Sequence, residues 1–282
     1  MTTRKANTLI FILTGLFIIY QILFPANPDN RFASAAWSIA LNVFAAIFLY
    51  IFLQTIIHIN QFWFYIQTQF IYRNKEIRIS LAYLYRIHVN NKYLLVKSNH
   101  RRYYQPVGGA YKTLPGSEKI FDKCDVRPDR LIETSNGIAK GDLRVYVKGV
   151  NVTDFMDWFN SKEDREISPW REFCEELVSE GVLPSRPFRY IDYKFKKTIK
   201  TPIFRLDSGD LGFFMYDIFD LVANDEQKAI LEELCKKGDT EYHIWADEYL
   251  INRLGHDERN RQHVYDISIH TKWAHNLKYS KA

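Results

Sequence analysis

Two long stretches without a charged residue lie close to the N-terminus and constrain the chain more than any other feature. The first covers residues 8–24, and the second covers about residues 33–57. As a helix, at ~1.5 Å per residue, the first measures about 26 Å, slightly less than the ~30 Å hydrocarbon core of a bilayer. The second is long enough to span that core with room for tilt. The sequence therefore predicts two transmembrane helices.

The segment between the two runs, residues 25–32, is short and contains two prolines and two asparagines, which favour a turn and hence an antiparallel helical hairpin. Basic residues flank both runs on the same side of that hairpin: Arg4 and Lys5 before it, and Arg73, Lys75 and Arg78 after it. The positive-inside rule then places both termini in the cytoplasm.

These features divide the chain into three parts. We predict a two-helix transmembrane anchor over residues 1–60, an interfacial linker rich in aromatic residues over 61–77, and a cytosolic domain over 78–282. Two alternatives stay open: a signal peptide cleaved near Ala33-Ser34-Ala35, and a soluble protein that buries both apolar runs.

The part of the chain beyond Tyr72 is nearly neutral, with a balance of only +3 of the net charge of +5. Such a balance provides no broad basic face for duplex nucleic acid, although a local basic pocket is compatible with it. The three cysteines, Cys124, Cys174 and Cys235, are far apart and lack the spacing of a zinc site, so we expect reduced thiols.

The cytosolic domain reads as an α+β fold in which strands and helices are mixed along the chain. The alternation of apolar residues predicts a β-hairpin formed by residues 79–89 and 93–97 around Asn90-Asn91. The other expected strands are 142–148, 188–198, 210–221, 241–245 and 267–273, and the other expected helices are 152–160, 168–180, 224–237 and 247–254. A mixed sheet with helices on both faces is the expected architecture.

Two segments carry the features of a binding site. The Pro106–Gly109 segment follows a strand and predicts a tight turn through which a ligand could approach the backbone. In the helix expected over 168–180, Glu172, Glu175 and Glu176 share one side and Arg171 lies four residues before Glu175. Such carboxylates can bind Mg²⁺, and Mg²⁺ can hold a diphosphate. A solvated acidic helix face is the alternative interpretation.

This helix resembles the signature box of the Nudix family. Arg171, Glu172, Phe173, Glu175 and Glu176 match its Arg-Glu-bulky-x-Glu-Glu core, and Glu163 stands eight residues before Arg171, where the box has its first glutamate. The Gly108-Gly109 pair is similar to the glycines that open the box. About fifty residues separate Gly109 from Glu163, so the box is split by an insertion. The insertion puts the alignment of a substrate in doubt.

The resemblance implies a divergent Nudix-type α/β/α sandwich behind the membrane anchor. The order of the parts is most similar to two-helix effectors of bacterial cyclic-oligonucleotide antiphage systems (CBASS). It implies catalytic roles for Glu163, Glu172, Glu175 and Glu176, the last three also as Mg²⁺ ligands. Nucleotide binding would involve Arg101, Arg102, Gly108, Gly109 and Arg171. Arg101 and Arg102 alternatively form a basic loop that faces anionic lipid.

Three functions are compatible with the sequence. The first is an effector in the bacterial inner membrane that binds a nucleotide second messenger, self-associates, and disrupts the membrane or arrests growth. The second is a membrane-tethered, Mg²⁺-dependent Nudix hydrolase of a nucleoside diphosphate derivative, although the degenerate box leaves its activity open. The third is a membrane adaptor without catalysis.

Overall fold

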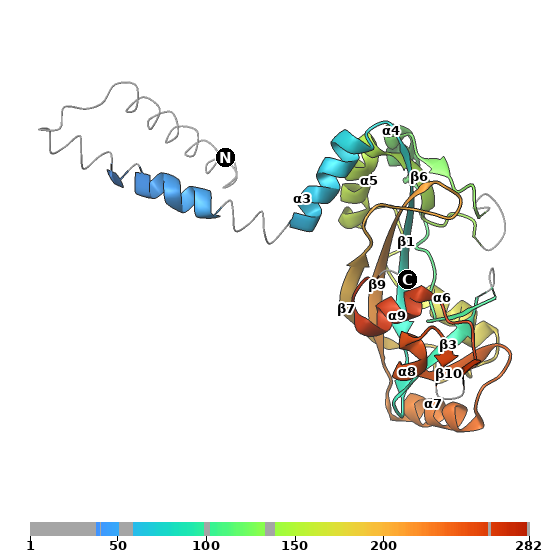
Figure 1. The fold of residues 1–282 in the computed structure, drawn as a ribbon. Coiled ribbons are helices and arrows are strands. Elements are labelled where there is room, and N and C mark those ends of the chain that lie inside the picture. Colours follow the sequence, from blue (N-terminus) through green and yellow to red (C-terminus); the bar gives the residue numbers. More distant parts are fainter. Residues whose placement is uncertain are drawn as a thin grey trace, which may run out of the picture. The chain divides into compact units, whose positions relative to one another are not determined.

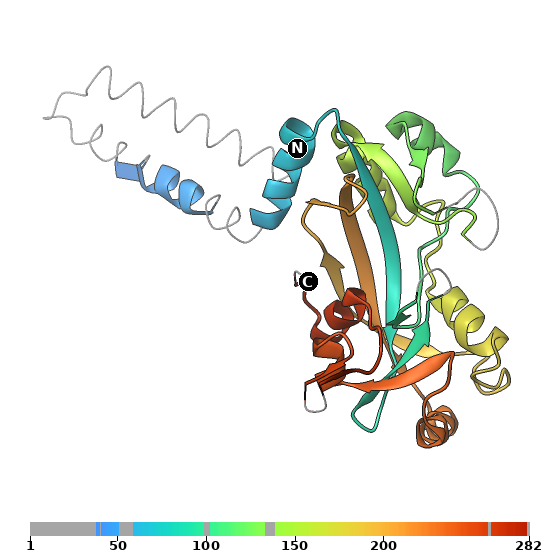
Figure 2. The same cartoon turned by 45° about the vertical axis from the view of Figure 1, so that its right-hand side comes forward.

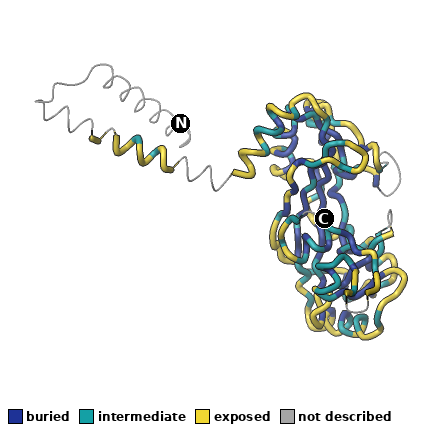
Figure 3. The backbone as a smooth tube through the Cα atoms, viewed as in Figure 1, coloured by how far each residue is buried: buried dark blue, intermediate teal, exposed yellow. Residues whose placement is uncertain are grey.

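The computed structural model describes residues 38–39, 41–50, 59–98, 102–132, 139–258 and 261–280 (Figure 1). The chain divides into two compact units, Met1–Ile66 and Gln67–Ala282. Every buried apolar side chain among the described residues belongs to the second unit, and Figure 3 marks buried residues through the interior of that unit. The second unit therefore has a hydrophobic core of its own.

The first unit is described only in part. Residues 41–50 and α3 (Ile59–Ile66) are helical, and their large apolar side chains, such as Phe48 and Trp63, are exposed. The first expected membrane helix, residues 8–24, lies outside the described residues, as does most of the second. No helix within the described ranges has both the length and the apolar character to cross a membrane. The hairpin stays a prediction.

The second unit is built on a sheet whose central strand is β1 (Glu76–Arg86). The strands follow in the order β5 (Arg127–Pro128), β6 (Arg144–Lys148), β1, β9 (Leu211–Val222) and β7 (Asp192–Lys200), while β8 (Phe204–Arg205) also pairs with β9. Strands β1 and β9 run parallel, and the other pairs are antiparallel. Figures 1 and 2 show β1 and β9 side by side along the length of the domain.

Helices cover both faces of this sheet. Successive side chains of a strand point to opposite faces, and β1 uses the two sides differently. On one side, the Tyr85 ring lies 5.6 Å from that of Phe173 in α6 (Trp170–Phe173). On the other, Ala82 and Leu84 pack with Trp273 of α9 (Ile269–Asn276). The expected mixed sheet with helices on both faces is confirmed.

A smaller sheet contains the predicted turn but not the whole predicted hairpin. Its order is β10 (His243–Asp247), β3 (Lys92–Lys97) and β2 (His88–Val89), with β4 (Tyr104–Gln105) also paired with β3. Asn90 and Asn91 have φ values of 47° and 62°, as a tight two-residue hairpin requires. The prediction that all of 79–89 pairs with 93–97 is wrong, because β1 hydrogen-bonds to β6 and β9 instead.

The C-terminal segment 267–273, expected as a strand, forms helix α9 from Ile269. Ser268 begins this helix, and its side chain accepts a hydrogen bond from the Thr271 N–H. Because Trp273 and Ala274 are neighbours and both buried, the segment packs with a helical rather than an alternating pattern. The remaining elements are η1 (Gln67–Ile71), α4 (Glu118–Cys124), α5 (Gly149–Ser161), η2 (Cys174–Ser179), α7 (Asp225–Lys237), α8 (Glu248–Asn252), β11 (His256–Asp257) and β12 (Gln262–His263).

The described residues of the insertion between Gly109 and Glu163 form regular elements of the domain. They supply α4, β5, β6 and α5, and two of these elements extend the main sheet beyond β1. A buried ion pair between Arg78 of β1 and Asp129 ties the insertion to the central strand. The described part of the insertion therefore widens the sheet.

Candidate functional site

The Gly108-Gly109 segment and the glutamate helix meet at the edge of β1. The segment runs beside the strand, where the Tyr83 N–H donates to the Gly109 carbonyl over 3.0 Å. The Gly108 N–H donates to Glu176 Oε2 over 2.8 Å. A Cβ atom on Gly109 would lie 2.2 Å from Glu172 Oε1. The glycines therefore make room for carboxylates that are more than sixty residues away in the sequence.

The glutamates come from a helix that changes type. Helix α6 continues directly into η2, a π-helical segment, and the Trp170 N–H donates to Ser168 Oγ over 3.3 Å at the start. The three carboxylates differ in exposure: the Glu172 side chain is 14% exposed and that of Glu175 is 46% exposed. Glu176 is partly buried as well. Local π-helical turns are frequent at functional sites.

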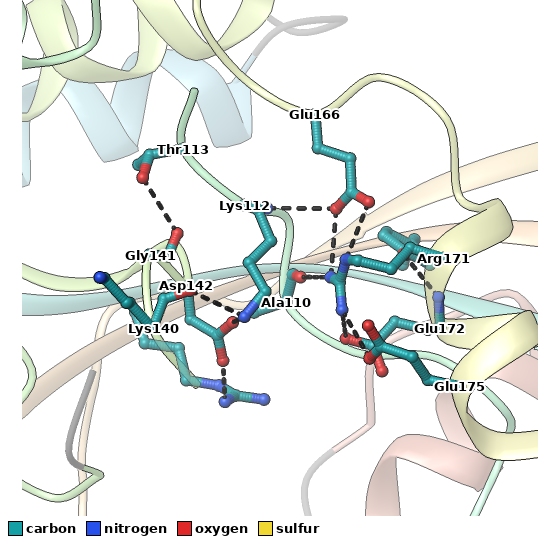
Figure 4. A network of polar contacts seen from close by, with 12 residues as sticks. Ala110, Lys112, Thr113, Lys140, Gly141, Asp142, Glu166, Arg171, Glu172 and Glu175 are labelled. Carbon is teal, nitrogen blue, oxygen red and sulfur yellow. Dashed lines mark hydrogen bonds and ion pairs between the residues drawn. The ribbon is translucent and has the colours of Figure 1, made fainter. Parts of the chain in front are cut away.

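Arg171 holds the cluster together (Figure 4). Its guanidinium donates to Glu166 Oε1 over 3.0 Å, to Glu172 Oε1 over 2.7 Å and to Glu175 Oε2 over 3.0 Å. It also donates to the Ala110 carbonyl over 2.8 Å. We call Arg171 and these four partners the Arg171 cluster. The planar, permanently charged guanidinium suits such a set of convergent oxygens.

The glutamate that the structure brings to Arg171 from the preceding loop is Glu166. Glu163, expected in this place from the spacing of the box, is exposed, and the hydrogen bonds of Arg171 go to Glu166, Glu172, Glu175 and Ala110 instead. Lys162 and Asp164 have positive φ values of 65° and 52°. These two left-handed residues turn the loop sharply. Counting along the sequence could not foresee the place of Glu166.

The cluster extends to three charged residues that the sequence analysis did not select. The Lys112 N–H donates to Glu166 Oε2 over 3.2 Å, and its ammonium lies 2.8 Å from Asp142 Oδ1. Arg144 Nη1 lies 2.5 Å from Asp142 Oδ2. Figure 4 shows Asp142, Lys112, Glu166 and Arg171 in a row beside Ala110. Nothing in the spacing of Lys112 and Asp142 identifies them as partners, because they belong to different strand segments.

Burial and neighbouring negative charges disfavour the charged forms of Glu172 and Glu176. Burial raises the pKa of Glu172, and Glu175 and Asp142 raise it further, while Arg171 lowers it. Burial likewise raises the pKa of Glu176 well above its usual range, and the charge of Glu172 adds to this effect. Arg171 therefore offsets the like charges only in part.

The predicted Mg²⁺ ligands Glu172, Glu175 and Glu176 are close in the structure, but they do not fit a metal site as arranged. Arg171 takes one oxygen each of Glu172 and Glu175, and Gly108 takes one of Glu176. Across the described ranges, no group of three His, Cys, Asp or Glu side chains is placed to hold a metal ion. No chemical step through Mg²⁺ follows from this arrangement.

Of the two arginines predicted to bind phosphate, Arg101 falls outside the described residues. Arg102 is exposed, and no ion pair joins it to another described residue.

Comparison with known proteins adds one positive finding. A protein-family model described as SMODS-associated NUDIX domain matches residues 76–275. The match begins with β1, ends within α9, and includes both glycines and the three glutamates of the site. No curated protein matches the chain.

Replacement of the two glycines tests the geometry of the edge. Gly108→Ala should lower the free energy of unfolding by at least about 2 kcal/mol, because φ is +141° and the Cβ would lie 2.1 Å from the Tyr83 carbonyl oxygen. Gly109→Ala should cost less, since the Glu172 carboxylate can move, but it should release Glu172 from Arg171. Urea unfolding measures both. The control Gly209→Ala has a positive φ but open space, so an equal loss at Gly209 and Gly108 would contradict the crowding.

Neutralisation of Glu176 tests whether its pKa is raised in the folded protein. When folding raises the pKa of a carboxyl group, the free energy of unfolding falls as the pH rises from the unfolded pKa of about 4.3 through the folded pKa. Glu176→Gln should therefore stabilise the protein at pH 8 by about 1 kcal/mol or more, and the gain should vanish near pH 4. Chemical unfolding in the presence of EDTA at both pH values measures this. Exposed Glu180→Gln is the control, and a gain independent of pH would count against a raised pKa of Glu176.

Proposed function

Because this chain belongs to the SMODS-associated Nudix domain family, we propose that it is an effector of bacterial antiphage defence whose Nudix-type domain binds a nucleotide second messenger. The family match over residues 76–275 carries the proposal. The contact of Gly108-Gly109 with Glu172 and Glu176 supports it, since it reunites the two halves of a Nudix-like box in one place.

The groups that we assign to binding have different parts. The exposed guanidinium of Arg102 attracts a phosphate, because charge-assisted hydrogen bonds to phosphate are strong. The exposed carboxylate of Glu175 accepts hydrogen bonds from a ribose hydroxyl or a base amino group. Arg171 reduces the negative charge that a phosphate would otherwise meet. A cyclic oligonucleotide presents all of these partner groups.

The signal is then delivered at the membrane. In this proposal the apolar runs 8–24 and 33–57 anchor the protein in the bacterial inner membrane as a helical hairpin, with both termini in the cytoplasm. Ligand binding promotes self-association, and the anchors disturb the bilayer or arrest growth. The domain order supports a role in a CBASS-type system, in which a neighbouring enzyme supplies the cyclic oligonucleotide.

A Mg²⁺-dependent hydrolase is the second candidate. Nudix domains commonly use Mg²⁺, and the raised pKa values of Glu172 and Glu176 indicate carboxylates that a cation would stabilise in their charged form. Arg171 and Gly108 already engage oxygens of all three glutamates, so we place recognition before catalysis. A non-catalytic adaptor, the third candidate, would bind neither nucleotide nor metal.

Calorimetry separates the three candidates. The full chain in detergent micelles should bind a cyclic oligonucleotide in EDTA as well as in Mg²⁺. Arg102→Ala should weaken binding by roughly tenfold or more, since one charge-assisted hydrogen bond contributes about 1.5–3 kcal/mol. Lys228→Ala, which removes an exposed cation of α7, should leave affinity unchanged.

The other outcomes are equally informative. Absence of heat with any cyclic oligonucleotide would sink the nucleotide sensor. Mg²⁺-dependent turnover of a nucleoside diphosphate derivative, lost in Glu175→Gln and Glu176→Gln, would instead establish the hydrolase. If the protein shows no binding and no turnover, the non-catalytic adaptor is the remaining candidate.

Protease protection tests the anchor. In inside-out inner-membrane vesicles, added protease should digest residues 78–282 and spare the segment 25–32, because the hairpin places that segment in the lumen. In right-side-out vesicles the domain should be protected. Recovery of the intact protein in the soluble fraction, without either kind of vesicle, would refute the anchor while leaving nucleotide binding open.

A further inference from the structure

One short segment carries as much net positive charge as the entire chain. Residues 186–200, which comprise β7 and the residues leading into it, include six basic side chains and one acidic one. Their balance of +5 equals the formal net charge of the entire chain. All six basic residues are exposed. We call the exposed side chains of this segment the β7 patch.

Most of this charge is uncompensated. Lys196 lies 3.2 Å from Asp220, which also receives Arg86. The other five basic residues, Arg186, Arg189, Lys194, Lys197 and Lys200, form no ion pair with any residue that the structure describes. An unpaired cluster of this kind attracts an anionic partner.

Aromatic residues alternate with these cations along the segment. In the register of β7 with β9, the side chains of Tyr193 and Phe195 point to the opposite face of the strand from Lys194 and Lys197. Tyr190, Tyr193 and Phe195 are 78%, 38% and 52% exposed, respectively. Phe195 and Tyr193 rest on Phe219 of β9, with ring centroids 5.7 and 5.4 Å away, so the sheet supports them in place. Tyrosine and phenylalanine beside basic residues are typical of surfaces at the boundary between water and lipid.

The position of β7 makes the patch accessible. It is the last strand in the order β5-β6-β1-β9-β7, so its outer edge has no strand partner within the described part of the chain (Figure 1). A bulge between Phe195 and Lys197 also interrupts its register with β9. Lysines on an edge strand and a bulge both discourage the edge from pairing with another strand.

We propose that the β7 patch docks the domain onto an anionic bilayer surface. Charge complementarity with acidic headgroups and the exposed rings favour this occupant, and the two apolar runs of the sequence favour a location near a membrane. A second copy of the same strand is disfavoured, because its uncompensated cations would face those of the first. This docking does not depend on nucleotide binding.

Vesicle sedimentation tests the proposal with residues 67–282, which have their own core and lack the apolar runs. This protein should bind vesicles containing about one third phosphatidylglycerol and not purely zwitterionic ones, and salt should weaken the binding. Lys194→Glu, Lys197→Glu and Lys200→Glu together should lower the partition coefficient by at least about 100-fold. Each basic residue near an anionic surface contributes about 1 kcal/mol, and about 1.4 kcal/mol corresponds to a tenfold change. Thermal unfolding checks that each variant is folded.

A matched control has the same net charge. Lys119→Glu, Lys228→Glu and Lys236→Glu together alter exposed lysines of α4 and α7 and should retain most of the binding. Tyr190→Ser with Phe195→Ser should weaken binding without a change in charge. Equal loss in the control would overturn the proposal, because net charge alone would then explain binding.

Two further results would also overturn the proposal. If the wild-type protein fails to bind anionic vesicles, the remaining role for the lysines is to discourage other strands from pairing with the edge of β7. Failure on vesicles combined with salt-dependent binding of a single-stranded oligonucleotide, again lost in the β7 triple variant, would assign the patch to nucleic acid instead. Neither result would bear on nucleotide binding at the Arg171 cluster.

Discussion

The Arg171 guanidinium pairs with Glu166 and Glu172 near it in the sequence and donates a hydrogen bond to the Ala110 carbonyl, 61 residues away, so that it joins the glutamate helix to the Gly109–Ala110 edge beside β1. Removal of the guanidinium would leave several half-buried carboxylates without a counter-charge, which is far costlier than the loss of one surface ion pair. The approach of Glu172 to Gly109, and with it the shape of the site, depends on this single side chain.

This dependence explains how a Nudix-type box can be split by an insertion of about fifty residues. The glycines and the glutamates need to meet in space, and hydrogen bonds from β1 to Val107 and Gly109 fix one partner while Phe173 anchors the other against Tyr85. The inserted strand β6 extends the sheet along the first half of β1, so it does not separate the glycines from the glutamates. Contact between the two halves of the box is thus compatible with a long separation in the sequence.

The same distinction between local and distant effects decides what the sequence could predict. The side shared by Glu172, Glu175 and Glu176 and the turn at Asn90-Asn91 follow from local periodicity and turn chemistry, and both were predictable. The partners of β1, the helical state of 269–276 and the position of Glu166 depend on tertiary packing and on two left-handed residues. The ion pair of Asp142 with Lys112 likewise arises only when two separate segments meet.

A site built from like charges lowers the stability of the fold that contains it. Burial next to Glu172 makes the charged form of Glu176 unfavourable, and no hydrophobic contact requires a carboxylate there. Neutral side chains of similar shape would pack at least as well, so packing alone does not account for two buried carboxylates against a glycine edge. Proteins retain such unfavourable groups where a ligand needs them. The raised pKa values of Glu172 and Glu176, together with their contacts to Gly108 and Gly109, therefore argue for a binding function beside β1, independently of the family match.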